Sequence, residues 1–240
     1  MTLGLGDRLY AIGDIHGRSD LLDRLHTQIR ADAAKAPPGR RLAVYLGDYV
    51  DRGPDSRGVI DRAMEPDLPG FDTITLLGNH DFMMREFLVD PMEWGPGWLS
   101  AVNGGGATLS NYGVEPPRRV YDPAAMAAAR DALDRTLPPA HRAFLRGLLP
   151  YHEEGRYLFV HAGIRPGVAL ERQSLDDLIW IREEFLESRA DHGRVVVHGH
   201  TILPAPALEP NRIGIDTGAW RTGILTAVAL SAGEPRFLST

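Results

Sequence analysis

The chain of 240 residues contains no cysteine, which excludes a disulfide framework, a thiolate metal site and a catalytic thiol. No uninterrupted apolar stretch approaches the ~18 residues that a membrane-spanning helix requires. The first seven residues also lack the basic region followed by an apolar run that marks a secretory signal. These absences predict a cytoplasmic protein without a membrane partner.

Basic residues form no block or stripe in this sequence. There are 26 Lys and Arg against 32 Asp and Glu, which gives a formal net charge of -6 at pH 7. Nucleic-acid binders typically gather Lys and Arg on one face, so the acidic balance disfavours nonspecific binding of DNA or RNA. The apolar fraction of 43% is that of an ordinary globular protein with enough bulk for a core.

Three short stretches with glycine and aspartate organise the first third of the chain. They read Gly13-Asp14-Ile15-His16-Gly17, Gly47-Asp48-Tyr49-Val50-Asp51-Arg52-Gly53 and Gly78-Asn79-His80-Asp81. Each follows an apolar, β-prone run, and these runs cover residues 9–12, 42–46 and 74–77. The separations from Asp14 to Asp48 and from Asp48 to Asn79 are each close to the ~30 residues of a strand, a crossover helix and a return strand.

This spacing predicts two consecutive βαβ units. Right-handed crossovers leave successive parallel strands side by side, so their carboxyl ends lie along one edge of one sheet, where open α/β sheets bind ligands. The polar side chains of the three stretches should therefore converge. They are Asp14, His16, Asp48, Asp51, Arg52, Asn79 and His80.

The remaining chain supplies more helices and strands. Helices are predicted from Ser19 as an N-cap and over residues 55–64, 81–88, 123–137 and 139–149. Strands are predicted over residues 157–161, 195–198, 212–215 and 223–230, the last pairing with 236–238. Without a solenoid repeat or a linker, the simplest packing is a single domain over residues 1–240, with two facing sheets and helices outside.

The pattern changes over residues 90–139. Residues 94–98 and 103–106 are rich in glycine and are predicted to be irregular. Long connections in compact domains are usually lids, binding loops or disordered segments, and the tryptophans here argue against disorder. Two interpretations stay open: a packed excursion with its tryptophans in a satellite core, or an insertion that acts as a lid over the substrate.

Two more histidine stretches stand at predicted strand ends, namely His161-Ala162-Gly163 and His198-Gly199-His200-Thr201. Together with the first three stretches they form a mixed set of carboxylate, carboxamide and imidazole groups. Such a set suits Mn²⁺, Fe or Zn²⁺ better than Ca²⁺, which prefers oxygen ligands, or Cu(I), which prefers sulfur. Mn²⁺ is the ion we expect.

The candidate ligands are numerous enough for two divalent ions. Asp14 and His16 are two residues apart, so both project to one side of an extended segment and can reach one ion. Asp48 would bridge, and the second ion would be completed by Asn79, His161 and His200. Two ions ~3.5–4 Å apart can activate a water and clamp the attacking and leaving oxygens of an in-line displacement at phosphorus. The alternative is burial of these costly groups with non-metal partners.

These five blocks, in this order over residues 13–201, resemble those of the calcineurin-like metallophosphoesterase superfamily. More narrowly, they resemble the phosphoprotein phosphatase family that includes bacteriophage lambda phosphatase. The resemblance implies an α/β fold, a four-layer αββα sandwich with two facing mixed β-sheets. It also implies one ion on Asp14, His16 and Asp48, and a second ion on Asp48, Asn79, His161 and His200.

Four residues are candidates for catalysis. The planar guanidinium of Arg52 suits two phosphate oxygens, and similar enzymes supply a second arginine after a Leu-Trp pair, here Arg182. His80 would give a proton to the leaving oxygen, and Asp51 would orient its imidazole. The alternatives are a local ion pair between Asp51 and Arg52, and a surface salt bridge from Arg182 to Glu183 or Glu184.

Two further polar residues have no assigned role. His198 does not match the blocks of the family. Asp216 could support the metal ligands or simply end a strand in a turn.

The ending Asp51-Arg52-Gly53 favours a protein phosphatase acting on phosphoserine, phosphothreonine or phosphotyrosine. The alternative is a dinucleoside polyphosphate hydrolase, because bacterial diadenosine tetraphosphate hydrolases are similar and share Arg52-Gly53-Pro54-Asp55-Ser56. Those hydrolases typically lack an aspartate where Asp51 stands. A third reading, an interaction module on an inactive fold, is disfavoured by the complete ligand and acid set. The expected partner is a phosphorylated protein or a small phosphoester.

Overall fold

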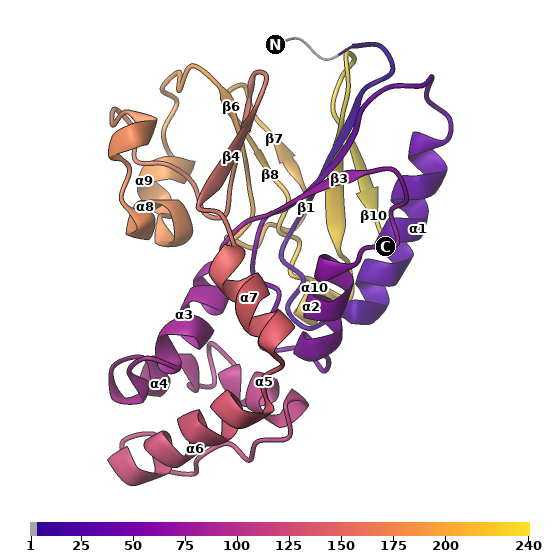
Figure 1. The fold of residues 1–240 in the computed structure, drawn as a ribbon. Helices are drawn as coiled ribbons and strands as arrows, with labels where there is room; N and C mark the ends of the chain where they lie inside the picture. The colour runs from indigo at the N-terminus through magenta and orange to yellow at the C-terminus, as the bar shows by residue number, and fades with distance from the viewer. Residues whose placement is uncertain (1–3) are drawn as a thin grey trace.

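The computed structural model describes residues 4–240, and two five-stranded sheets lie at its centre (Figure 1). The first sheet has the order β10-β9-β1-β2-β3, and the second has the order β4-β5-β6-β8-β7. Both sheets mix parallel and antiparallel pairs. The strands of the first sheet are β1 (Arg8–Ile12), β2 (Arg41–Tyr45), β3 (Asp72–Thr75), β9 (Thr226–Leu230) and β10 (Arg236–Ser239). Those of the second are β4 (Tyr151–Glu154), β5 (Tyr157–Val160), β6 (Val195–His198), β7 (Ala207–Leu208) and β8 (Arg212–Gly214).

Alternation along the strands creates separate cores on the two faces of each sheet. Leu9 and Ala11 of β1 meet Phe159 and Val197 of the second sheet in a buried cluster between the sheets. The intervening Tyr10 faces the other way, toward a cluster that contains residues of the helices. This period of two is what a strand imposes on its side chains, and it confirms the prediction of two facing sheets.

Helices cover the outer faces. On the first sheet lie α1 (Ser19–Ala33) and α2 (Ser56–Met64), and on the second lie α8 (Leu175–Trp180) and α9 (Glu183–Leu186), with the short 3₁₀ turn Leu170–Arg172 before them. Burial of Leu178, Ile179 and Phe185 against β5 and β6 completes the fourth layer. The predicted αββα architecture is confirmed.

A group of helices extends beyond the carboxyl ends of the strands, at the lower end of Figure 1. It contains α3 (Asn79–Phe87), α4 (Pro91–Trp98), α5 (Gly105–Asn111), α6 (Pro123–Thr136) and α7 (Pro139–Gly147). A last short helix, α10 (Ala219–Thr222), precedes β9. Across residues 4–240, none of the helices combines the length and the apolar character that crossing a lipid bilayer requires.

Some local predictions were wrong. Residues 94–98 and 105–106 are helical, in α4 and α5. Asp90 caps α4 by accepting the backbone N–H groups of Met92 and Glu93, and Trp98 at the end of this helix is fully buried in the main core. Packing of the tryptophan therefore outweighs the low helix propensity of glycine. Ser19 does not cap α1 either, since Arg18 occupies the N-cap position and the Ser19 hydroxyl donates to Asp55.

Candidate metal centre

The register of the strands brings the predicted ligands to one edge of the two sheets. Ile12 at the end of β1 pairs with Tyr45 at the end of β2, and Tyr45 pairs with Thr75 at the end of β3. The loops that follow these strands therefore start at the same level. The ends of β5 and β6 supply His161 and His200 from the facing sheet.

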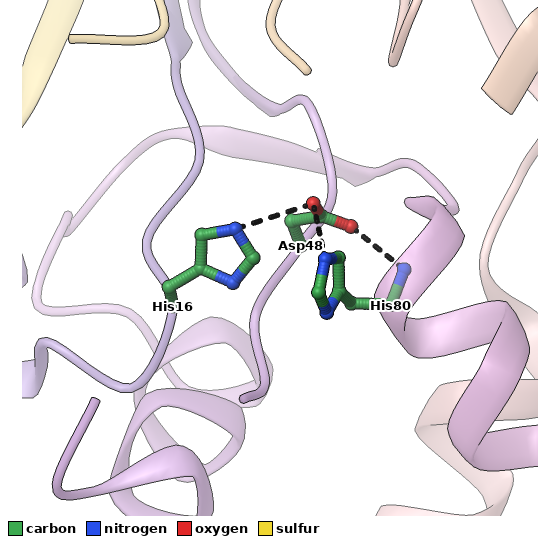
Figure 2. Close-up of side chains that lie close together, drawn as sticks. All are labelled: His16, Asp48 and His80. Atoms are coloured by element: carbon green, nitrogen blue, oxygen red, sulfur yellow. Dashed lines mark hydrogen bonds and ion pairs between the residues drawn. The ribbon is translucent and has the colours of Figure 1, made fainter. Parts of the chain in front are cut away.

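One group of candidate ligands surrounds Asp48 on the side of the first sheet (Figure 2). His16 Nε2 lies 3.4 Å from Asp48 Oδ2, and His80 Nε2 lies 4.0 Å from the same oxygen. The backbone N–H of His80 donates to Asp48 Oδ1 at 3.0 Å. All three residues are buried, so their polar atoms are shielded from water.

A second group shares Asp48 and adds the histidines of the second sheet. His161 Nε2 lies 3.5 Å from Asp48 Oδ1 and 2.9 Å from Asn79 Oδ1. His200 Nδ1 is also 2.9 Å from Asn79 Oδ1. Asp48 thus belongs to both groups, as expected of a residue that bridges two ions.

The protonation of these imidazoles favours a bound cation. His161 donates Nδ1–H to the backbone carbonyl of Leu46 at 2.9 Å, so the neutral ring turns the lone pair of Nε2 toward Asn79 Oδ1, which is also an acceptor. His16 is held in the same way by the carbonyl of Val50. In the described part of the chain, His200 Nε2 is buried without a hydrogen-bond partner. Metal-binding histidines commonly have one ring nitrogen bonded to a backbone carbonyl, as His161 and His16 have here.

Burial and neighbouring charges shift the pKa values in the directions that a cation site requires. Burial lowers the pKa of His16 and of His161, so both rings are neutral. Burial alone would raise the pKa of the Asp48 carboxyl, but any facing imidazole that carries a proton, His161 above all, would hold it below its usual value, so in this buried set the carboxyl is the group that gives up its proton. The result is an ionised carboxylate among neutral nitrogen donors, which fits a divalent ion.

Asp14 lies beside both groups rather than inside either. Its carboxylate accepts the backbone N–H of His200 at 3.0 Å. Burial raises the pKa of Asp14, and the neighbouring carboxylates of Asp216 and Asp48 raise it further. Asp216 is itself buried, with a pKa raised by burial to about 6, and it accepts the backbone N–H of Gly218. Buried carboxylates this close repel one another, and a divalent cation would relieve that repulsion.

Asp51 holds His80 in place. Its Oδ2 accepts Nδ1–H of His80 at 2.7 Å and Nε1–H of Trp98 at 2.8 Å, while Oδ1 accepts the hydroxyl of Thr108 at 2.6 Å. The sequence predicted the contact with His80. It missed Trp98 and Thr108, and the signal available was a tryptophan and a threonine inside a segment otherwise rich in glycine.

Asp81 is a second residue that the sequence reasoning left without a role. Its carboxylate accepts the backbone N–H groups of Asp48, Tyr49 and Gly78 at 2.8 to 3.1 Å. The first turn of α3 thereby fixes the loop that carries Asp48. The signal was the position of Asp81 three residues after Gly78, where an acidic side chain can complete a capping box.

The two predicted phosphate-binding arginines lie beside different groups of candidate metal ligands. Arg52 Nη1 is 2.7 Å from His16 Nε2, whereas Arg182 Nη1 donates to Thr201 Oγ1 at 3.1 Å, next to His200. Among residues 4–240, neither arginine forms the alternative ion pair considered above: Asp51 pairs with His80, and Glu184 pairs with Arg165. The Leu-Trp pair before Arg182 is part of helix α8.

Left-handed backbone is confined to this region among the non-glycine residues of the described chain. The residues with positive φ, between 46° and 74°, are His16, Asp48, Asp51, Arg52 and His200. Such conformations cost about 1–3 kcal/mol each and gather at functional sites. His198, by contrast, packs with its ring nearly perpendicular to that of Phe185 and lies outside both groups of candidate ligands.

A family model described as calcineurin-like phosphoesterase matches residues 7–219. The chain belongs to the calcineurin-like phosphoesterase family. This confirms the superfamily named from the five sequence blocks, and with it the prediction of an enzyme class that hydrolyses phosphoric esters. Membership of the family does not by itself select phosphoproteins as substrates.

Relatives of this phosphoesterase chain carry more specific names. A symmetrical bis(5'-nucleosyl)-tetraphosphatase of Acidovorax sp. (strain JS42) is 31% identical over 160 residues, which are 66% of this chain and 44% of the relative. The asymmetrical bis(5'-nucleosyl)-tetraphosphatase PrpE of Anoxybacillus flavithermus is 26% identical over 236 residues, which are 90% of this chain and 88% of the relative. The match therefore spans less than half of the first relative and most of the second.

Solved structures share the fold of this phosphoesterase. A provisionally assigned diadenosine tetraphosphatase superposes with a TM-score of 0.63 at 21% identity, covering 99% of this chain and 95% of the other. Protein phosphatases are also among the structures with this fold. At these identities the likeness concerns the fold alone.

Proposed function

We propose that this chain is a metal-dependent hydrolase of dinucleoside polyphosphates. The observation that carries the proposal is that relatives with specific names, one of them aligned over nine-tenths of the chain, are named bis(5'-nucleosyl)-tetraphosphatases. The order of preference between the two substrate classes considered above is thereby reversed. The geometry supports the reaction type, since the candidate ligands of both sheets meet around Asp48.

In this proposal the side chains at the sheet edge hold two divalent ions, of which Mn²⁺ fits the mixed oxygen and nitrogen donors. The first ion would be held by Asp14, His16 and Asp48, and the second by Asp48, Asn79, His161 and His200. Such ions supply Lewis acidity that polarises phosphoryl oxygens and lowers the pKa of water. The neutral imidazoles of His16 and His161 support this ligand set, as does His200, which turns Nδ1 toward Asn79 Oδ1.

The arginines would bind the phosphate that is attacked. Arg52 beside His16 and Arg182 beside His200 lie on the two sides of the ligand groups, so two guanidinium forks can hold different phosphoryl oxygens. Their positive charge would offset the charge of a polyphosphate chain and keep the phosphorus in line with the attacking water.

His80 would give a proton from Nε2 to the leaving oxygen, while Asp51 holds Nδ1–H. Residues 90–139 would contribute to this step as an insertion next to the substrate. Its helices α4 and α5 supply Trp98 and Thr108 to Asp51, which supports a role in shaping the site. The lid and the cytoplasmic location stay predictions.

The proposal is tested by assaying the Mn²⁺-loaded protein on diadenosine tetraphosphate and separating the nucleotide products. Two molecules of ADP indicate symmetrical cleavage, and ATP with AMP indicates asymmetrical cleavage. The Asp48→Asn variant, which loses a ligand of both groups, is expected to be at least a hundredfold slower. No release of nucleotides from this substrate by the loaded wild-type protein would reject the proposal.

A phosphoprotein phosphatase is the second candidate, and the pair of Asp51 and His80 favours it. The leaving group of a dinucleoside polyphosphate is the phosphate end of a nucleotide. It needs little protonation, because the second pKa of a phosphate monoester is about 6. A serine alkoxide is far more basic and gains more from a general acid. Parallel assays on phosphoserine, phosphothreonine and phosphotyrosine peptides decide between the candidates by the ratio of kcat/KM values.

A further inference from the structure

A partly exposed tryptophan stands directly beside one of the proposed phosphate-binding arginines. Trp220 of helix α10 is 36% exposed, and the guanidinium carbon of Arg52 lies 5.3 Å from the centre of its ring. The same guanidinium reaches His16 Nε2 at 2.7 Å. One arginine side chain therefore separates the indole from the candidate metal ligands.

Helix α10 is held firmly although it has only four residues. Arg18 of the loop before α1 donates to the carbonyl of Ala219 at 3.0 Å, and Ala219 itself is buried. The hydroxyl of Thr222 donates to the carbonyl of Thr217 at 2.9 Å. These bonds tie both ends of the helix to neighbouring loops, so the indole is presented from a fixed backbone.

Arg52 is ordered on two sides. Its backbone N–H donates to the carbonyl of Gly104 at 3.4 Å, and a Cβ on Gly104 would lie 3.1 Å from Arg52 Cγ. The Arg52 side chain thus lies between the backbone of Gly104 and the ring of Trp220. The backbone contact already restrains Arg52, so orienting the arginine does not by itself require the exposed part of the indole.

Exposed aromatic surface contributes no free energy of burial in the free protein. That free energy becomes available when a flat ligand covers the surface. Nucleobases stack on tryptophan whatever their sequence, because every base has an aromatic face. A base attached to a phosphate held by Arg52 is therefore well placed to reach the indole.

We propose that Trp220 stacks on a nucleobase of the substrate and so selects nucleotides over phosphates without a base. The inference rests on the proposed function, because it assumes that the phosphate held by Arg52 belongs to a nucleotide. Trp220 then determines specificity and takes no part in the chemical step. The stacked base and the bound phosphate would be recognised by neighbouring groups, the indole and the guanidinium.

The test compares ADP with inorganic pyrophosphate as inhibitors of p-nitrophenyl phosphate hydrolysis, because both carry a diphosphate and only ADP carries a base. The Trp220→Ala variant is expected to raise the inhibition constant of ADP about tenfold more than that of pyrophosphate. The Trp220→Phe variant, which keeps an aromatic ring, should recover part of that difference. Trp94→Phe is the matched control, because Trp94 packs on Phe82 in α3.

Fluorescence gives a readout that does not depend on turnover. ADP should quench indole emission in the wild type and in Trp94→Phe, and much less in Trp220→Phe. Equal increases of both inhibition constants in Trp220→Ala would overturn the proposal, since Trp220 would then act only by ordering Arg52. Unchanged quenching by ADP in Trp220→Phe would overturn it as well.

The proposed function can fail separately. If diadenosine tetraphosphate is not cleaved but the difference between ADP and pyrophosphate is found, stacking stands and the substrate is another nucleotide. If diadenosine tetraphosphate is cleaved with equal efficiency, relative to p-nitrophenyl phosphate, by the wild type and Trp220→Ala, the stacking proposal alone is rejected.

Discussion

The Asp51 carboxylate has little freedom to move. It is fully buried and receives hydrogen bonds from His80, Trp98 and Thr108, and its own backbone is in the left-handed region. A carboxylate fixed in this way can hold one tautomer of the imidazole and stabilise its protonated form. The value of that arrangement depends on how basic the leaving group is.

The Asp51→Asn variant should therefore lose most activity on substrates with basic leaving groups. We expect kcat on a phosphoserine peptide or an alkyl phosphate to fall ~10²-fold or more, within the range of general acid catalysis. On p-nitrophenyl phosphate and diadenosine tetraphosphate the fall should be at least tenfold smaller. The measurement is a plot of log kcat against the pKa of the leaving group.

Asp90→Asn is the control for this series, because asparagine caps a helix as well as aspartate does and Asp90 acts at the start of α4. Its rates should match the wild type. An Asp51→Asn variant that is slowed equally on all leaving groups would show that Asp51 does not support proton transfer.

His26 makes stability depend on pH at a place away from the candidate metal ligands. It is buried in α1, with Nε2 2.7 Å from the hydroxyl of Tyr45. Burial lowers the pKa of His26 from 6.5 to about 4. The unfolded chain therefore binds a proton below pH 6.5 that the folded chain does not bind until about pH 4, so stability is lost as the pH falls through this window.

The His26→Gln variant should lose less stability in that window. Glutamine can still bond to the Tyr45 hydroxyl but does not titrate. The shift corresponds to roughly 3 kcal/mol between pH 6.5 and 4 in the wild type. Urea unfolding of both proteins at several pH values measures the difference, in which the contributions of the other histidines cancel. Parallel curves for the two proteins would mean that His26 is protonated in the folded state.

At the scale of elements, the first turn of α3 organises the loop after β2. Asp81 in that turn accepts three buried backbone N–H groups, two of them from the loop of Asp48. The link joins a helix to a strand end that precedes it by more than 30 residues. It is a structural reason for the aspartate that follows Asn79 and His80.

Replacing Asp81 by alanine should leave those N–H groups without an acceptor. Each unsatisfied buried group costs about 1–3 kcal/mol, so we expect the free energy of unfolding to fall by about 3 kcal/mol or more. Asp81→Asn keeps one acceptor oxygen and should lose less. Urea denaturation measures both variants, and a loss below about 1 kcal/mol in Asp81→Ala would contradict this role.

Strands and crossover helices could be predicted because their signals are local. Apolar runs such as residues 42–46 predicted β1 to β3 within a few residues, and the helix predicted to start at Ser19 is α1. Helices α4 and α5 were missed because their formation depends on distant contacts, such as the burial of Trp98 in the main core. The short strands β4 and β7 were also not predicted. They lie at the edges of the second sheet, and their sequences show little alternation of apolar and polar residues.

In the candidate site, too, some residues could be predicted from local sequence and others depend on distant contacts. Its candidate ligands could be predicted because each stands next to a strand end, and strand ends of one sheet share an edge. Trp98, Thr108 and Trp220 could not be placed, since nothing near them in the sequence indicates which loop they will face. The proximity of Asp14 to Asp216 is also a product of the packing of the two sheets.

For the whole molecule, a bound divalent ion should contribute to stability as well as to activity. The candidate ligands come from both sheets, so an ion would cross-link them. At an ion concentration of 100 times Kd the gain is about 2.7 kcal/mol. With a shift of about 2–4 °C per kcal/mol for a chain of this size, Tm should rise by roughly 5–10 °C.

Thermal unfolding in EDTA and in Mn²⁺ checks this prediction. Phosphoesterase activity should disappear in EDTA and return with Mn²⁺. The Asp48→Asn variant, which lacks the carboxylate common to both groups, should show a much smaller shift in Tm. Identical Tm values for the wild type in the two conditions would count against a metal centre between the sheets.

The bond from His200 to Asp14 joins residues 186 positions apart in the chain. During synthesis on the ribosome, the acidic loops after β1 and β2 emerge long before the histidines that complete their surroundings. A nascent chain that has reached residue 160 therefore lacks His161 and His200, the candidate ligands from the second sheet. The surroundings of Asp48 are therefore complete only after β6 and the loop that carries His200 have been synthesised.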